Sequence, residues 1–346
     1  MEFSNILVQW YLQNKRDLPW RETINPYNIW LSEIILQQTR VDQGMAYYLK
    51  FVAHFPTVFE LANASEEQVL KLWQGLGYYS RARNLHYSAK YIVNKLQGKF
   101  PSSYIELLKL KGVGDYTASA IASICYNEST AVVDGNVYRV LARYFGIATP
   151  INSTNGIKEF KLLAETLLNP AISGTHNQAV MEFGARMCKP QNPDCENCPL
   201  NISCVSLEKK IIKNLPVKEK KLKIKNRFFN YLVVQTCDNK TIIEKRHEGI
   251  WLNLYQFPLI ETKHEIDEKQ LVHTDKFEAL FANLNTSVQL FNMEQVVHKL
   301  SHQHIFANFW IVKTSKSDKF NINWSEIRRF PVPILIDNFL NEYKSN

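Results

Sequence analysis

Four of the six cysteines in this chain lie close together, with the spacing Cys188-x6-Cys195-x2-Cys198-x5-Cys204. Four thiolates this near in sequence can surround one metal centre, because the loop that must close is short. Disulfides are rare in cytoplasmic proteins, so a metal is the better explanation. Zinc and a 4Fe–4S cluster both accept four thiolates, although zinc sites more often use two Cys-x2-Cys pairs and only one is present here. On spacing alone, both metals remain open.

The two other cysteines, Cys125 and Cys237, stand in apolar stretches. Free cysteine is one of the most frequently buried residue types. We therefore expect both to be ordinary core residues.

A Gly-x-Gly turn, Gly112-Val113-Gly114, stands between two segments of helical character. Glycines permit positive φ and close backbone approach, so that N–H groups at the start of the second helix can meet a phosphate. An ordinary turn between helices explains a bare Gly-x-Gly equally well.

Asp134 ends a short apolar run and precedes another helical segment, which makes it a good N-cap. Backbone donors and the helix dipole would hold such a carboxylate ionised. A fixed negative charge of this kind can stabilise a developing cation.

Glu33 lies in the middle of a predicted helix, among mostly apolar neighbours and with Trp30 and Gln37 on the same face. Apolar surroundings would raise the pKa of its carboxyl group, which suits a general acid. A glutamate that faces solvent is the competing interpretation.

The elements that must position these residues divide the chain into two regions. Residues 4–207 show helical spacing of apolar side chains almost throughout, and the opening residues predict an amphipathic helix that ends near Asp17. The clearest helical segments are 30–34, 85–96, 118–126, 137–145 and 179–187. Further along, aromatic and β-branched residues predict strands over 228–235, 240–245 and 305–313, with helices over 275–282 and 334–343.

We therefore predict a multi-domain protein, with an all-α domain over 1–207 and a separate α+β domain over 227–346. The linker between them, 208–226, contains eight lysines and could touch phosphates or simply be solvated. The net charge of +8 and the pI of about 9.0 are compatible with a polyanionic partner without requiring one. The sequence contains neither a membrane-spanning apolar run nor a recognisable signal peptide, so we expect a cytoplasmic, nucleoid-associated protein without a membrane partner.

The cysteine spacing and residues 110–118 (Leu-Lys-Gly-Val-Gly-Asp-Tyr-Thr-Ala) together resemble the endonuclease III superfamily of helix-hairpin-helix DNA glycosylases. The resemblance implies a six-helix part with the hairpin over 25–130 and an iron–sulfur part over 1–24 and 131–207. It also implies a 4Fe–4S cluster on the four cysteines, DNA contacts at Gly112 and Gly114, and a catalytic Asp134. Relatives that also cut the strand carry a lysine where Tyr116 stands; a phenol cannot form a Schiff base, which predicts a glycosylase without efficient lyase activity.

Within that superfamily, residues 18–21 (Leu-Pro-Trp-Arg), 25–39 and 75–85 closely resemble the adenine DNA glycosylase family. The resemblance implies that Glu33 protonates N7 of a flipped-out adenine and that Asp134 stabilises the sugar cation, with help from Tyr116 and Asn136. The adenine pocket would be formed by Trp20, Arg21, Gln178 and Met181, although core roles for Trp20 and Met181 are equally compatible. The residues expected to enter the duplex or face the orphaned base are Gln38, Thr39, Leu76 and Tyr78.

Residues 227–346 resemble the family's Nudix-like recognition domain, through 244–246 (Glu-Lys-Arg) and 249–258 (Gly-Ile-Trp-Leu-Asn-Leu-Tyr-Gln-Phe-Pro). No acidic metal-binding box follows, which argues against nucleotide hydrolysis. The family reads 8-oxoguanine with a Phe-Ser-His turn, and here Leu300 replaces the phenylalanine before Ser301 and His302. Ser301 could still bond the N7–H of 8-oxoguanine.

The predicted substrate is therefore double-stranded DNA with adenine opposite 8-oxoguanine or guanine, bound by a monomer. An endonuclease-III-like pyrimidine glycosylase with lyase activity is the main alternative, and Tyr116, Glu33 and the C-terminal domain argue against it. A DNA-binding protein without catalysis would leave the combination of Glu33, Asp134 and Tyr116 unexplained. A Nudix-type hydrolase would require nucleotide turnover with magnesium.

Overall fold

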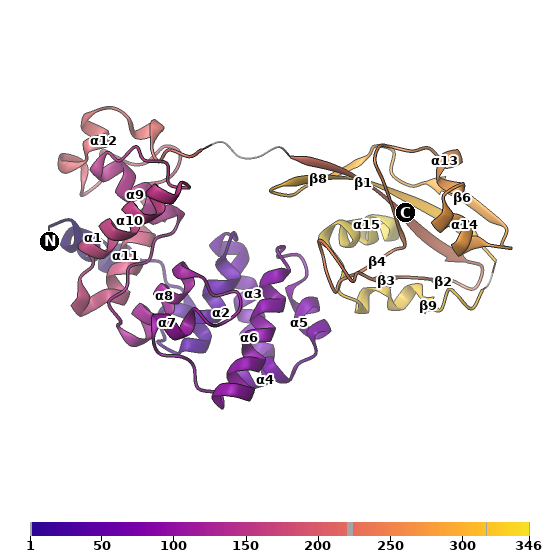
Figure 1. Cartoon of the computed structure of the whole chain (residues 1–346), viewed down its shortest axis with the longest axis horizontal. Coiled ribbons are helices and arrows are strands. Elements are labelled where there is room, and N and C mark those ends of the chain that lie inside the picture. The colour runs from indigo at the N-terminus through magenta and orange to yellow at the C-terminus, as the bar shows by residue number, and fades with distance from the viewer. Residues whose placement is uncertain (1, 220–223, 316, 346) are drawn as a thin grey trace. The chain divides into compact units, whose positions relative to one another are not determined.

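The structure, a computed structural model, describes residues 2–219, 224–315 and 317–345 (Figure 1). Residues 220–223 of the predicted linker lie outside the described residues. The chain forms two units: Met1–Asn63 with Asn84–Lys220, and Ala64–Arg83 with Lys221–Asn346. The predicted boundaries instead placed residues 64–83 in the helical domain. None of the described helices combines the length and apolar character needed to cross a membrane.

The first unit is built from helices, in agreement with the predicted helical spacing. Its helices of at least ten residues are α1 (Glu2–Asn14), α2 (Pro26–Leu36), α3 (Val41–His54), α6 (Ser80–Leu96, which begins in the second unit), α8 (Asp115–Tyr126), α9 (Gly135–Phe145), α10 (Thr154–Leu167) and α11 (Ser173–Arg186). The shorter ones are η1 (Pro19–Arg21), α4 (Val58–Asn63), α7 (Tyr104–Leu107), η2 (Pro170–Ile172), η3 (Asn201–Ser203), α12 (Val205–Glu208) and η4 (Ile212–Asn214). The opening helix ends at Asn14, slightly before the predicted Asp17.

One apolar core joins the two ends of the helical sequence. Phe3, Leu7 and Tyr11 of α1 pack in the same cluster as residues of α9, α10 and α11. Trp10 meets Phe183 of α11 edge to face, with ring centroids 5.0 Å apart. The N-terminal helix is thereby held against the helix that carries Gln178, Met181 and Glu182.

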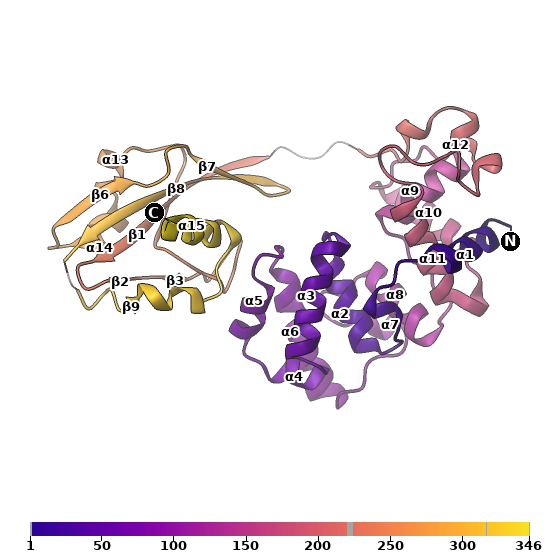
Figure 2. The same ribbon diagram turned by 180° about the vertical axis from the view of Figure 1, so that it is seen from behind.

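The second unit contains a five-stranded sheet with the strand order β5-β1-β8-β6, in which β7 also pairs with β8 (Figure 2). The central strands β1 (Lys225–Thr236) and β8 (Gln303–Thr314) are parallel, and the other pairings are antiparallel. The remaining strands are β2 (Lys240–Thr241), β3 (Glu244–Lys245), β4 (Tyr255–Gln256), β5 (Leu259–Thr262), β6 (Thr286–Leu290), β7 (Val296–Lys299) and β9 (Ile322–Asn323). The helices are α5 (Glu66–Trp73), α13 (Glu268–Val272), α14 (Asp275–Phe281), η5 (Trp324–Arg329) and α15 (Ile334–Ser345).

Alternating residues of the sheet are buried on opposite faces, as the period of a strand requires. Leu232 and Trp310 belong to a core that includes Phe277 and Phe281 of α14. On the other face, the ring of Phe309 stacks on Phe339 of α15 at 4.2 Å. The prediction of one strand over 240–245 is wrong, because β2 and β3 pair with two different partners, β9 and β4.

Candidate active site

A cavity of about 190 Å³ in the first unit collects residues that the sequence places far apart. It is lined by side chains from η1, α2, α8, α9 and α11. All eight predicted catalytic and adenine-binding residues are in its wall, namely Trp20, Arg21, Glu33, Tyr116, Asp134, Asn136, Gln178 and Met181. Thr39 lines the same cavity, whereas Gln38 is exposed beside it in sequence and has a positive φ of 57°.

Glu33 is buried in the middle of α2, with 8% of its surface exposed. Its Oε2 atom is buried and has no hydrogen-bond partner among the described residues. Burial raises the pKa of Glu33 to about 7, with a smaller opposing effect from the hydrogen bond of Tyr116. Asp134 raises this pKa further and Arg21 lowers it. The solvent-facing alternative is therefore wrong, and the carboxyl group has the proton affinity of a general acid near neutral pH.

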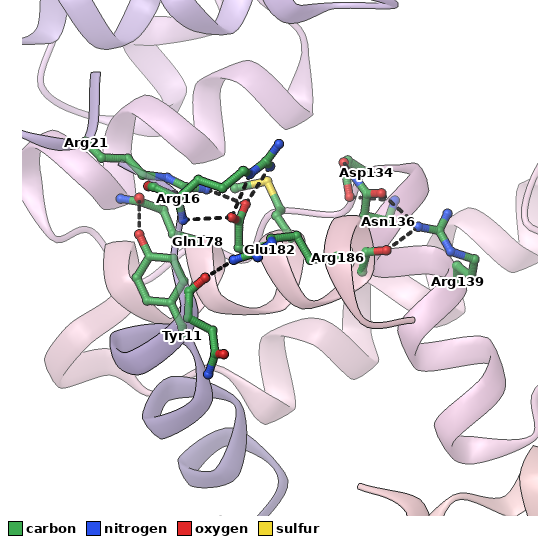
Figure 3. Close-up of polar contacts among 12 residues, drawn as sticks. Tyr11, Arg16, Arg21, Asp134, Asn136, Arg139, Gln178, Glu182 and Arg186 are labelled. Carbon is green, nitrogen blue, oxygen red and sulfur yellow. Dashed lines mark hydrogen bonds and ion pairs between the residues drawn. The ribbon is translucent and has the colours of Figure 1, made fainter. Parts of the chain in front are cut away.

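Asp134 is the N-cap of α9, as predicted (Figure 3). Its Oδ1 accepts hydrogen bonds from the backbone N–H groups of Asn136 and Val137, both at 2.8 Å, and its Oδ2 accepts one at 2.7 Å from the Asn136 amide. We expected these donors to hold the carboxylate ionised. Burial nevertheless has the larger effect and raises the pKa of Asp134 above its ordinary value, against the lowering by these bonds and by Arg139.

Asn136 is fixed from both sides. Its Oδ1 accepts a hydrogen bond of 2.8 Å from Arg139, which also donates to the carbonyl oxygens of Gly184 and Cys188. Gly184 allows this close approach of α11, because a Cβ there would come within 2.7 Å of the Asn136 Cβ and 2.9 Å of its carbonyl oxygen. A larger residue at Gly184 would displace Asn136 from the cavity wall.

Tyr116, at the start of α8, presents a neutral hydroxyl group to the cavity. Burial, reinforced by the nearby carboxylates of Glu33 and Asp134, raises the pKa of Tyr116 well above its ordinary value. Its Oη lies 3.7 Å from the sulfur of Met181 and also interacts with Glu33. The phenol can therefore donate a hydrogen bond but cannot serve as an anionic nucleophile at neutral pH.

One part of the cavity wall contains an ion-pair network that the sequence did not predict (Figure 3). Glu182, which is 1% exposed, accepts bonds of 2.8 and 2.7 Å from the Arg16 guanidinium and of 2.7 Å from Arg21. Burial alone would raise the pKa of Glu182, but these hydrogen bonds lower it to about 2. Tyr11 donates a bond of 2.7 Å to Gln178 Oε1, which fixes the orientation of that amide.

Trp20 and Met181 illustrate why a core role and a pocket role are hard to separate. Trp20 is buried and meets Tyr48 edge to face at 5.1 Å, yet it also lines the cavity. Met181 packs at the edge of the helical core and contacts Tyr116 from the cavity side. Both residues therefore pack against the protein interior and also form part of the cavity wall.

The hairpin places its two glycines differently. Gly112 has a φ of +85°, and a Cβ there would clash with the Asn84 side chain at 2.8 Å. Gly114 is the N-cap of α8 in extended backbone, with nothing within 4 Å of a Cβ built on it. Positive φ is therefore required at Gly112 alone, while Gly114 leaves the N-terminus of α8 open.

Two family models match separate parts of the chain. Residues 31–164 match the model of the HhH-GPD superfamily base excision DNA repair protein, and residues 230–342 match the NUDIX domain. An adenine DNA glycosylase of Buchnera aphidicola (subsp. Baizongia pistaciae) is 35% identical over 348 residues, which cover 96% of this chain and 94% of the relative. The chain belongs to the adenine DNA glycosylase family.

Other relatives agree over the helical part. The human adenine DNA glycosylase is 45% identical over 211 residues, 58% of this chain and 39% of the human protein. A thermostable thymine-DNA glycosylase has a similar structure, with a TM-score of 0.56 and 31% identity over 60% of this chain and 96% of that chain. The predicted family, the two-part fold and the activity of a DNA glycosylase in base excision repair are thus confirmed.

In this adenine DNA glycosylase, the four clustered cysteines line one apolar cavity next to Arg143. Arg143 donates to the carbonyl oxygens of Lys189 and Pro190, and its Nη1 lies 3.5 Å from the sulfur of Cys188. Burial and the three neighbouring thiols raise the pKa of Cys198 to about 11. Within the described ranges no three His, Cys, Asp or Glu side chains meet the geometry of a metal site.

The isolated cysteines differ from the prediction. Cys125 on α8 is half-buried, and burial raises its pKa to about 12. Cys237 is exposed in the turn after β1, so the prediction of a core residue is wrong for it. A residue in a turn is exposed because the chain reverses there, even when the residues before it are apolar.

The remaining predicted DNA contacts belong to the second unit of the glycosylase. Leu76, Tyr78, Ser301 and His302 line a cavity of about 410 Å³ together with Trp251 and other residues. Tyr78 is 53% exposed and has a positive φ of 47°, whereas Leu76 is 7% exposed. Ser301 and His302 are both exposed, and their side chains lie 3.2 Å apart. A DNA contact by Leu76 would have to be made inside this cavity.

Proposed function

We propose that this glycosylase removes adenine paired with 8-oxoguanine, or with guanine, by acid-catalysed hydrolysis in the cavity around Glu33. The observation that supports this most directly is Glu33 itself, a buried carboxyl group with a pKa near 7 and one oxygen left without a partner. Adenine leaves poorly as an anion, so a proton donor at its ring nitrogen lowers the barrier. An acid with this pKa is about half protonated at neutral pH.

In the first step, Glu33 protonates N7 of an adenine flipped into the cavity. The glycosidic bond breaks, its electron pair stays with the protonated adenine, and the sugar becomes an oxocarbenium-like cation. Asp134, as a carboxylate, stabilises or captures that cation. Glu33, now ionised, accepts a proton from water as the water oxygen bonds to the sugar carbon, which restores the acid.

Tyr116 and Asn136 act as positioning donors in this scheme. The neutral phenol of Tyr116 orients the Glu33 carboxyl, and the Asn136 amide orients Asp134. Trp20, Arg21, Gln178 and Met181 form the wall against which the base would rest. Since Tyr116 occupies the position of the lyase lysine, the product is an abasic site in an intact strand.

On the DNA side, Gln38 and Tyr78 fill the gap left by the flipped base, with Leu76 next to Tyr78 and Thr39 facing the orphaned base. Ser301 and His302 read that base, and the N–H groups beyond Gly112 and Gly114 hold a phosphate. The enzyme is proposed to act as a cytoplasmic, nucleoid-associated monomer. Its functional parts are proposed as residues 1–207 for catalysis, 208–226 for the linker and 227–346 for recognition.

A 4Fe–4S cluster held by Cys188, Cys195, Cys198 and Cys204 is part of this proposal. Four soft donors around one apolar space fit the group, and binding of the cluster would release protons from the thiols. When bound, the cluster would cross-link the loop through four thiolates. Arg143, through its bonds to Lys189 and Pro190, fixes the start of that loop.

Base release from a duplex with one adenine opposite 8-oxoguanine, assayed with and without hot alkali, tests the proposal. We expect strand cleavage at the adenine only after alkali, and none with Glu33→Gln. Glu159→Gln, an exposed site on α10 with the same change of charge, is the matched control and should behave as the wild type. Absence of adenine release, with cleavage instead at an oxidised pyrimidine, would overturn the proposed specificity.

A further inference from the structure

Residues 64–83 belong in sequence to the helical part of the chain but pack within the second unit. They comprise α5, the loop that follows it, and the first turn of α6. The loop carries Tyr78, which lines the same cavity as Ser301 and His302. The position of Tyr78 is therefore determined by whatever fixes this loop.

The backbone of the loop cannot be explained by local preferences alone. Three of its residues, Gly75, Gly77 and Tyr78, have positive φ values of 94°, 77° and 47°. A non-glycine residue in the left-handed region costs about 1 kcal/mol, so Tyr78 needs contacts elsewhere to hold it. An exposed ring on a strained backbone is expected to lose its orientation once those contacts are removed.

Gln74 provides such contacts at the start of the loop. Its Nε2 donates a hydrogen bond of 2.8 Å to Asp337 Oδ1 on α15. Its Oε1 accepts bonds of 3.3 Å from the backbone N–H of Val332 and 3.0 Å from Lys71 Nζ, which also donates to the Phe330 carbonyl at 3.2 Å. One half-buried amide thus joins α5, residues 330–332 and α15.

Hydrogen bonds from Tyr79 and Arg83 hold the end of the loop. Arg83 Nη1 donates a bond of 2.9 Å to the carbonyl oxygen of Leu252, beside Trp251. Tyr79 Oη lies 3.3 Å from the Val332 carbonyl oxygen. Trp251 lines the cavity, and its ring lies 5.7 Å from that of His298. The Tyr78 loop is held at both ends by the elements that form the rest of the cavity.

We propose that Gln74, through its bond to Asp337, is a positioning residue that sets the discrimination between orphaned bases. It does not touch DNA; it fixes the distance between Tyr78 and the Ser301–His302 turn, so that both can engage one base. This inference rests on the proposed function, in which the second unit reads the base opposite adenine. Gln74 affects specificity rather than the chemical step, because it lies in the second unit and the Glu33 cavity lies in the first.

The test compares single-turnover adenine release from two duplexes that differ only in the orphaned base, 8-oxoguanine or guanine. Gln74→Met keeps the length of the side chain and removes its polar atoms. We expect the ratio of the two rates to fall about fivefold, which corresponds to the net value of one ordinary hydrogen bond. Asp337→Ala removes the same bond from the other side and should lower the ratio equally. The double variant should be no worse than either single one.

Glu326→Gln is the control. It removes a surface ion pair with the exposed Arg329, also on η5, and should leave the ratio unchanged. A general loss of folding would lower both rates by one factor; that result, or an unchanged ratio in both single variants, would overturn the inference. A wild-type enzyme that releases adenine from both duplexes at the same rate would also overturn the inference. If the wild-type enzyme releases adenine from neither duplex, the proposed function fails instead, which separates the two failures.

Discussion

Glu33 and Glu182 line one cavity, are both buried, and have pKa values shifted in opposite directions. The pKa of Glu33 is raised to about 7 and that of Glu182 is lowered to about 2. Glu182 accepts hydrogen bonds from Arg16, through its backbone N–H and its guanidinium, and from Arg21. Glu33 has a phenol as its main partner, and one of its oxygens has none among the described residues.

The difference shows that the partners of a buried carboxyl group, rather than its burial, decide what it can do. With two guanidinium groups, Glu182 is a permanent anion that orders Arg16 and Arg21 along the cavity wall. Glu33 forms no ion pair within the described part of the chain, and it retains its proton until near neutral pH. Paired groups whose environments separate their pKa values in this way are the pattern expected for an acid and its supporting charges.

Asp134 is a third buried carboxyl group, held by N–H dipoles instead of by guanidinium groups. Its replacement is expected to have the largest effect on activity. In Asp134→Asn, the amide oxygen can still accept from the N–H groups of Asn136 and Val137, so the cap of α9 is retained. The negative charge next to the sugar is lost, and we expect single-turnover adenine release to slow about a thousandfold. Affinity for the uncleaved duplex, measured in parallel, should stay within about twofold. A loss of rate below about tenfold would mean that Asp134 is only a structural cap.

Replacing Glu182 with a neutral residue should destabilise the protein, whereas the same replacement at Glu33 should stabilise it. Because the folded pKa of Glu182 is lowered to about 2, its contribution is present above about pH 4.5 and is lost as the pH falls through 2. Glu182→Gln should reduce the free energy of unfolding at pH 7 by about 3 kcal/mol. Urea titrations at pH 7 and pH 3 measure this, with the smaller difference expected at pH 3. An equal loss at both pH values would show that packing, rather than charge, is responsible.

The sequence identified Glu33 but not Glu182, for a physical reason. Glu33 stands in a local string with a recognisable family pattern and apolar neighbours on its own helix. Arg16 and Arg21 are 166 and 161 positions before Glu182, so their ion pairs depend on how α1 and η1 pack against α11. The same limit explains Asp134: its cap was visible in the sequence, whereas the burial that raises its pKa comes from distant elements.

Helices and strands also could be predicted only where the signal is local in sequence. The helices over 85–96, 118–126 and 137–145 could be predicted because their period is local. The break between β2 and β3 could not, since each pairs with a strand contributed by a later part of the chain. Nor could residues 64–83 be assigned to the second unit, because Gln74 bonds to Asp337 across 263 positions.

Glu33→Gln should change the free energy of unfolding by less than Glu182→Gln does, and in the opposite direction. The folded pKa of Glu33 is raised above its ordinary value of 4.5, so the contribution of this group to stability is fully present below pH 4.5 and is lost as the pH rises through 7. A neutral glutamine does not carry this penalty, and the variant should be more stable than the wild type at pH 8 by about 2 kcal/mol, after allowance for the new buried N–H donors. At pH 4 this advantage should disappear. Urea titrations at both pH values measure it, with Glu159→Gln as the exposed control; a variant that is less stable at pH 8 would show that Glu33 has a charged partner when folded.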